Sequence, residues 1–470
     1  MMVLKIGKII RMAKKKIVET DQIDLFASPS VGDSDTPEAF KSTVKQMRGN
    51  RGEWAEVYVF LRLLADGFLA DKYKDDQKKD QEHRRVVVNV IRQHPDPVLY
   101  HLPSPTDTRY KKDFVYIRGG DGHGGFAPSS SLVIPREEFR AACIELERVL
   151  ADQKGEAGTF GLPESHTTMQ LIRKLGWASL KAPSDVKADL KITVAQDAKR
   201  TSEVMHTYSI KSALGGAATL FNADKASNFD YKIVPIESGG KEFSAEDAKE
   251  LNKIDSRQKI KERMVWLSEH GFKLEYKEVK SAVFSDNLKS SGNGQDIDVL
   301  LQSMLLKYFH AEGAEKRLVK ISDFIPVLAI DDPLGLKPKY KNESKVEGAY
   351  KQVVKTLLAH MALGMTSGKQ FDPEQVRDDV TGGMLVLKEE ASGRPSLCSH
   401  SLLHLNQLEN YLLENTRLET GSTTRHNFAQ AYLDENSKEW RMALNLQIRF
   451  VEERAPKPVK VAKPVQARMF

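Results

Sequence analysis

The sequence predicts a mixed α/β fold in which a central mixed sheet is flanked by helices and extended by further helices. Two strand-like runs, Asp189–Val194 and Val204–Ser212, are rich in β-branched and aromatic residues, and the polar residues 197–202 between them suit a hairpin turn. Residues 50–66 have the apolar spacing of an amphipathic helix. Two further helices with strong apolar faces are predicted at Asp296–Phe309 and Ala349–Met365.

Length and composition limit the class of protein. With 470 residues the chain can bury a large core and hold two or three subdomains. Its net charge of +6 and pI near 8.9 permit binding to a polyanion. No apolar run approaches the roughly 18 residues that a membrane span needs. The two cysteines, Cys143 and Cys398, form neither a disulfide framework nor a CxxC metal site, which favours a reduced, cytoplasmic setting.

The helix predicted at residues 50–66 carries two acids near its start. Its apolar face consists of Trp54, Val57, Tyr58, Leu61, Leu64 and Ala65. Glu53 and Glu56 are three residues apart and are therefore neighbours on the helix surface. They can be solvated side chains that interact favourably with the positive end of the helix dipole. However, RGEWAE also fits an R-G-x-x-x-E pattern in which several nucleases aim a first-helix glutamate at their metal ion.

The predicted hairpin brings an aspartate and a lysine onto neighbouring strands. Strand side chains alternate between the two faces of a sheet, so Ser209 and Lys211 point the same way and Ile210 is buried behind them. Asp189 stands at the start of the adjacent run. This pair resembles the core of the PD-(D/E)xK nucleases, in which the aspartate holds a divalent metal ion and the lysine assists the attacking water. Ser209 occupies the (D/E) position here, so a second acid has to come from elsewhere.

Several longer segments resemble the HpaII-type restriction endonucleases in the same order along the chain. They are GEWAEVYVFLRLLADG at Gly52–Gly67, SIKSALG followed by TLFNADKASNF, ENYLLENTRLETGSTTRH at Glu409–His426, and NLQIRF at Asn445–Phe450. The resemblance implies a PD-(D/E)xK core and a prokaryotic type II restriction endonuclease that hydrolyses double-stranded DNA at a short palindrome, CCGG or a variant. It also implies a Mg²⁺ cofactor and a DNA methyltransferase as genetic partner in a restriction-modification system, and it allows a homodimer.

The resemblance assigns a role to each candidate catalytic residue. Asp189, the carbonyl of Ile210 and Glu56 would bind Mg²⁺, and Glu53 is the alternative glutamate. Mg²⁺ prefers hard oxygen ligands, keeps several waters and needs few protein ligands. Lys211 would orient or deprotonate the attacking water, or stabilise the charge that develops on the phosphate. Ser209 would belong to the catalytic group without carrying charge.

Two polar segments are candidates for DNA contact. An ordinary polar turn would explain the first, yet arginine reading guanine and hydroxyls bonding phosphate are what sequence-specific recognition requires. Its members are Thr416, Arg417, Thr420, Ser422, Thr423, Arg425 and His426. The second segment, in TLFNADKASNF, contributes Asn222, Lys225 and Asn228.

The remaining elements are expected from apolar period and composition. Helices are predicted at Pro135–Leu150, Thr167–Leu175 and Ser244–His270, an extended pair at Phe272–Phe284, a strand at Thr381–Lys388, and a helix or long strand at Leu402–Leu413. The charged run Asp71–Arg85 predicts a solvated helix or loop, and the glycine-rich Arg118–Gly125 a flexible turn, with backbone approach to DNA as the alternative.

The expected organisation has five parts. They are a flexible basic tail at 1–45, a helical part with the GEWAE helix at 46–180, the catalytic hairpin and a DNA-facing loop at 181–240, a helical and DNA-recognition part at 241–450, and a disordered basic tail at 451–470. Two other functions remain open, namely a nuclease of repair or recombination that reads DNA structure, and a catalytically inactive DNA-binding protein. Ser209 leaves the second open, whereas Asp189 together with Lys211 argues against it.

Overall fold

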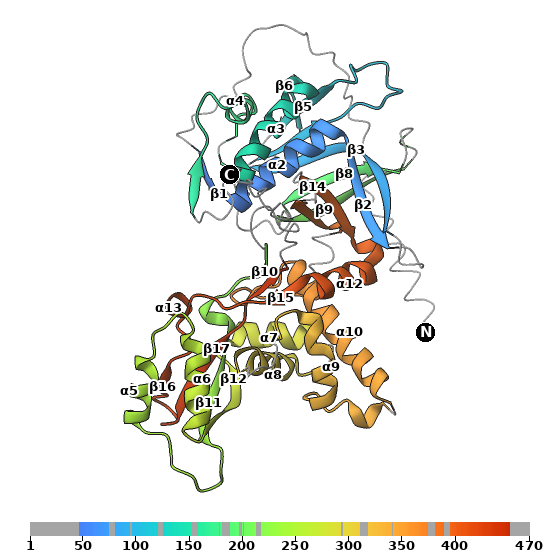
Figure 1. Ribbon diagram of the computed structural model, residues 1–470. Coiled ribbons are helices and arrows are strands. Elements are labelled where there is room, and N and C mark those ends of the chain that lie inside the picture. Colours follow the sequence, from blue (N-terminus) through green and yellow to red (C-terminus); the bar gives the residue numbers. More distant parts are fainter. Residues whose placement is uncertain are drawn as a thin grey trace, which may run out of the picture.

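A large mixed sheet organises one half of the molecule, and a helix-rich body forms the other half (Figure 1). The computed structural model describes residues 47–74, 80–94, 96–120, 126–152, 158–177, 179–180, 189–196, 200, 202–212, 218–292, 295–310, 318–340, 342–374, 381–389 and 395–451. The predicted tail at 1–45, and the predicted tail at 451–470 apart from its first residue, therefore lie outside the described residues. None of the described helices is long and apolar enough to cross a membrane.

The sheet has nine strands in the order β2-β14-β13-β9-β8-β3-β4-β5-β6. Because β2 also pairs with β3, six of these strands form a closed circuit of hydrogen-bonded neighbours. The strands are β2 (Phe68–Lys74), β3 (Asp80–His94), β4 (Asp96–His101), β5 (Phe114–Gly120), β6 (Phe126–Pro135), β8 (Leu190–Ala195), β9 (Glu203–Ser212), β13 (Gly383–Glu389) and β14 (Pro395–Ser401). The predicted hairpin is confirmed as β8 and β9, which are antiparallel and lie within this sheet.

Helix α2 (Arg51–Asp66) confirms the prediction for residues 50–66. It begins at Asn50, whose side chain and that of Glu53 form a capping box, and it ends at Gly67, which has a left-handed backbone. Its buried face packs against α3 (Arg136–Asp152) and the sheet. The same core includes α4 (Thr167–Lys174), and β1 (Arg48–Asn50) pairs with β7 (Thr159–Gly161) beside it.

The second body combines a four-stranded sheet, a three-stranded sheet and most of the helices. The four-stranded sheet contains β11 (Asn228–Pro235), β12 (Phe272–Val279), β16 (Ala431–Leu433) and β17 (Trp440–Asn445), and the three-stranded sheet contains β10 (Thr219–Phe221), β15 (Thr416–Leu418) and β18 (Ile448–Phe450). The helices are α5 (Ala245–Lys253), α6 (Lys259–Glu269), α7 (Ala282–Ser291), α8 (Ile297–Phe309), α9 (Ile321–Asp331), α10 (Glu343–Ala362), α12 (Leu405–Asn415) and the short α13 (Thr423–His426), with 3-10 turns at Lys225–Ser227, Lys337–Lys339 and Leu402–His404.

Strand β13 ties the two bodies together. It runs parallel to β9, and Ile210 is paired with Leu385. Successive side chains of β13 enter different cores, because Leu385 and Leu387 belong to the sheet core whereas Met384 and Val386 belong to the helical core. Residues far along the chain, within the predicted 241–450 part, thus complete the sheet that carries the catalytic hairpin.

The prediction for Asp71–Arg85 was wrong, because its described residues, 71–74 and 80–85, belong to β2 and β3. The Arg85 guanidinium is buried and donates to Asp71 Oδ1 at 2.8 Å and to the Tyr208 hydroxyl at 2.9 Å. Charges that neutralise each other across strands can enter a sheet, although a run of charged residues favours a solvated element.

Two predictions in the second body were also wrong. Residues 272–284 contain one strand, β12, followed by the start of α7, which Ser281 caps. The predicted helix at 244–270 is broken into α5 and α6. At the break, the buried Arg263 guanidinium donates to the carbonyls of Asn252 and Ile254, which a continuous helix would use internally. Residues 402–413, predicted as a helix or a long strand, are helical.

Candidate active site

The β8–β9 hairpin holds Asp189 against the segment Ser209–Lys211. The Asp189 amide donates to the carbonyl of Tyr208 at 3.0 Å, which extends the pairing of Leu190 with Tyr208 by one residue. The amide of Ile210 in turn donates to Asp189 Oδ2 at 2.6 Å. The aspartate is therefore oriented by the backbone of the strand that carries Lys211.

The environment of Asp189 both opposes and supports its charge. Burial raises the pKa of this carboxyl above its ordinary value, while the Ile210 amide, the positive charge of Lys211 and the Ser209 hydroxyl lower it. Ser209 is buried and hydrogen-bonds the Asp189 carboxylate. In this structure Ser209 thus orients the aspartate, whereas a carboxylate at the same position would add a second negative charge.

Helix α2 brings Glu56 to the same place. Glu56, Asp189 and Ile210 line one small cavity of about 20 Å³. Burial, together with the negative charges of Asp189 and Glu53, raises the pKa of Glu56 to about 8. The positive charges of Lys211 and Arg92 act in the opposite direction. Two carboxylates that cannot easily be charged together are a donor set that fits a hard divalent cation, because such an ion would neutralise both.

Glu53 has a different position from Glu56. Its carboxylate Oε2 accepts a hydrogen bond from the Asn50 amide at 2.8 Å, and the Asn50 side chain accepts one from the Glu53 amide at 3.0 Å. This reciprocal capping box satisfies donors at the start of α2. Glu53 does not line the cavity that Glu56 and Asp189 share, so the geometry favours Glu56 as the metal-binding candidate.

Arg92 on β3 also lies in this site, although no motif in the sequence points to it. It lines the cavity together with Glu56 and Asp189, and its guanidinium lies 3.6 Å from the ring centre of Trp177. Burial lowers the pKa of Arg92 to about 10, while the charge of Glu56 acts to raise it. No sequence signal separates Arg92 from other arginines, because only the tertiary structure brings β3 next to α2.

Glu56 should make the metal-free protein less stable as the pH rises from about 4.5 to about 8. Between these values the folded protein keeps a proton on Glu56 that the unfolded chain has lost, so raising the pH lowers the free energy of unfolding. Asp189, Glu53, Lys211 and Arg92 stay in place in Glu56→Gln, which should therefore lack this part of the slope. Thermal unfolding in a chelating buffer measures the difference, and identical pH profiles for the two proteins would contradict it.

The two segments predicted to face DNA are brought together in the helical body. The Asn228 side chain donates to the carbonyl of His426 at 3.0 Å, and a side chain at Gly421 would approach Ala223 to 2.9 Å. Burial lowers the pKa of His426, and among the charges near it Asp224 raises this pKa while Lys225 lowers it. The exposed residues Asn222 and Lys225 therefore lie on the same surface as α13.

The predicted DNA-facing residues differ in their exposure. Asn228 is buried and bonds to Asn445, and Thr416 is fully buried with its hydroxyl on the carbonyl of Leu412. These two residues are buried beneath the exposed surface and cannot contact DNA directly. Thr423 and His426 are partly buried, whereas Thr420, Ser422 and Arg425 are exposed.

The two candidate guanine-reading arginines are in different electrostatic surroundings. Arg417 Nη2 lies 3.0 Å from Glu419 Oε2, and Arg417 is paired across the sheet with Arg449. Arg449 also faces Glu419, at 3.5 Å. Arg425, near the end of α13, is exposed. Of the two candidates, Arg425 is therefore the more exposed, and Arg417 is the one that pairs with an acid.

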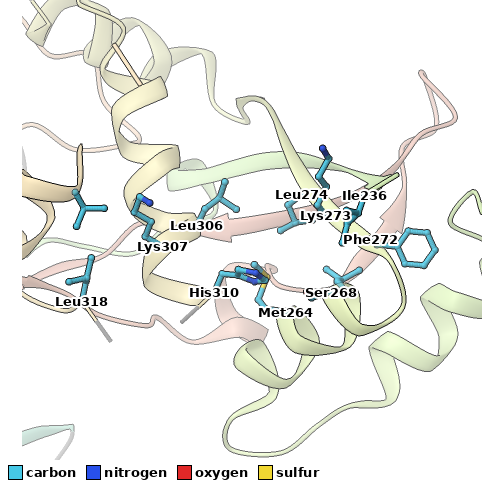
Figure 2. A pocket seen from close by; sticks show the side chains of 12 residues that line it. Ile236, Met264, Ser268, Phe272, Lys273, Leu274, Leu306, Lys307, His310 and Leu318 are labelled. Atoms are coloured by element: carbon cyan, nitrogen blue, oxygen red, sulfur yellow. The ribbon is translucent and has the colours of Figure 1, made fainter. Parts of the chain in front are cut away.

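A larger cavity, of about 710 Å³, lies in the helical body (Figure 2). Its lining is mostly apolar, with Lys307 and His310 on one side and Lys273 on another. It includes no carboxylate and shares no residue with the cavity around Glu56. Of these two cavities, only the small one therefore offers carboxylates to a cation. Within the described ranges, no three His, Cys, Asp or Glu side chains gather as a ready-made metal site.

Comparisons with known proteins agree with the motifs in the sequence. A family model described as HpaII restriction endonuclease matches residues 50–450. The type II restriction enzyme HpaII of Haemophilus parainfluenzae is 29% identical over 406 residues, which cover 86% of this chain and 98% of that enzyme. No solved structure matches the chain significantly. The matched region includes α2, the β8–β9 hairpin and α13.

Proposed function

The chain belongs to the HpaII restriction endonuclease family, and from that premise we propose that it cuts both strands of duplex DNA at a short palindrome in a Mg²⁺-dependent reaction. Membership makes it a restriction endonuclease that acts on DNA. The proposal adds a PD-(D/E)xK core, a CCGG-like site and a cognate methyltransferase that protects the host DNA. A palindrome has two-fold symmetry, so a homodimer would place one active site on each strand.

The observation that carries the proposal is the meeting of Glu56, Asp189 and Lys211 at one site from two elements. Glu56 comes from α2 and shares a cavity with Asp189, while Lys211 acts electrostatically on both carboxylates. Asp189, Glu56 and the Ile210 carbonyl would hold Mg²⁺, which tolerates few protein ligands. A bound divalent cation would supply positive charge against the phosphate as the transition state develops.

The chain's own residues then have separate tasks. Asp189 is held in place by the Ile210 amide and the Ser209 hydroxyl, so it needs little reorganisation when DNA arrives. Lys211 is half-buried beside both acids, and its ammonium would orient the attacking water or stabilise charge on the phosphate. Neither task requires Ser209 to ionise.

Incubation of the protein with plasmid DNA and Mg²⁺ tests the proposal. A restriction endonuclease produces discrete bands, and a chelator should abolish them. Cleavage of branched or damaged DNA without discrete plasmid fragments would instead favour a structure-specific repair nuclease. Binding to DNA without cleavage in either Mg²⁺ or Mn²⁺ would favour an inactive DNA-binding protein.

Arg425→Ala is expected to lower affinity for the cognate site by about 1–3 kcal/mol, because a bidentate contact with guanine would be lost. Affinity for a random duplex should change much less. Arg417→Ala is the matched control, since Arg417 already pairs with Glu419. Binding titrations in Ca²⁺ on both duplexes measure the difference. Equal losses on cognate and random DNA would assign Arg425 to phosphate and leave the base-reading residue unidentified.

A further inference from the structure

Arg92 is held rigidly behind the candidate metal site. Its side chain is 7% exposed, and Nη2 donates to the carbonyls of Ser179 and Leu180 at 3.1 and 2.8 Å. The face of the guanidinium stacks on Trp177, whose own Nε1 donates to the Tyr100 hydroxyl at 3.0 Å. Stacking and the two carbonyls together leave the guanidinium little freedom to reorient.

One donor of this fixed group has no partner. Nη1 of Arg92 is buried and makes no hydrogen bond with any described residue. An unsatisfied buried donor costs about 1–3 kcal/mol, more when it is charged, so it calls for an explanation. Arg92 lines the cavity together with Glu56 and Asp189, and of these two acids Glu56 is the one whose charge acts on Arg92.

We propose that Arg92 is a positioning residue, whose free Nη1 donates to the Glu56 carboxylate when Glu56 turns to bind a metal ion. The inference rests on the proposed function, since it needs Glu56 to be a metal ligand. Ligating carboxylates are commonly held by a hydrogen-bond donor behind them, and the loss of such a donor weakens metal affinity by about 10–100-fold. A planar guanidinium can bond to backbone carbonyls with one nitrogen and to a carboxylate with another, whereas a lysine ammonium lacks this fork.

Mn²⁺ binding to the full-length protein, measured by electron paramagnetic resonance without DNA, tests the proposal. Arg92→Lys keeps the positive charge and removes the fork, so we expect Mn²⁺ affinity to fall by about 10-fold. In a Glu56→Gln background the same substitution should change affinity less than about two-fold, because the group that Arg92 positions is already lost. This non-additivity distinguishes positioning from a general loss of structure.

Arg263→Lys provides a matched control. Arg263 is also buried and also donates to backbone carbonyls, but it lies in the helical body and should leave Mn²⁺ affinity unchanged. If Arg92→Lys does not fold, Trp177→Phe is used instead, because it keeps Arg92, weakens the stacking that supports the guanidinium and otherwise removes the hydrogen bond to the Tyr100 hydroxyl. We then expect a smaller loss of Mn²⁺ affinity, which should also vanish in the Glu56→Gln background.

The outcomes separate this inference from the function on which it rests. Wild-type affinity in Arg92→Lys, or equal losses with and without Glu56, would overturn the positioning role while Glu56→Gln still weakens metal binding. If Glu56→Gln itself binds Mn²⁺ like the wild type, the proposed metal site is wrong and the role of Arg92 fails with it.

Discussion

Replacement of Lys211 by alanine is expected to slow DNA cleavage by about 10³-fold or more, which corresponds to about 4 kcal/mol of transition-state stabilisation. Lys211 is the basic side chain that acts on both Asp189 and Glu56 from the hairpin. Its removal would leave the developing charge on the phosphate without this donor. Single-turnover cleavage of a cognate duplex in Mg²⁺ measures the change.

Asp189→Asn should have an effect of similar size for a different reason. An asparagine oxygen can still accept from the Ile210 amide, so the hairpin should keep its geometry while the metal loses a charged ligand. Both variants should retain wild-type circular dichroism and bind cognate DNA in Ca²⁺. Cleavage within a few-fold of wild type by either folded variant would show that the nuclease site lies elsewhere.

Glu56→Gln is expected to reduce cleavage by at least about 10²-fold, or roughly 3 kcal/mol. Ser209 cannot ionise, so without Glu56 the metal would keep Asp189 as its single acidic ligand. Cleavage rates across a range of Mg²⁺ concentrations measure the loss, and partial recovery at high Mg²⁺ would point to weakened metal binding. Ser209→Asp should partly restore activity to the Glu56 variant, because it adds an acid beside Asp189.

Glu53→Gln serves as the control for the same helix. Glutamine can also complete a capping box, so this variant should keep both the stability of α2 and the cleavage rate. A dead Glu53→Gln together with an active Glu56→Gln would exchange the two roles. If both variants cut DNA normally, α2 is structural and the second ligand lies in another part of the chain.

The sequence alone determined the elements whose information is local. The apolar period at residues 50–66 predicts α2 because a helix face depends on residues only a few positions apart. The β8–β9 hairpin follows from alternation and a polar connection for the same reason. The place of Asp189 beside Ser209 and Lys211 is a consequence of that register, and the family follows from the order of the motifs.

Only the tertiary structure decided which distant residues meet. Arg92 and Trp177 join Glu56 because β3 and the segment after α4 pack beside α2, a choice made by the whole core. Asp71 and Arg85 enter the sheet as a pair, although each reads as a surface charge in the sequence. The surface around Arg425 gains Lys225 through buried Asn228. Such contacts depend on the packing of elements far apart in the chain, and no local pattern encodes them.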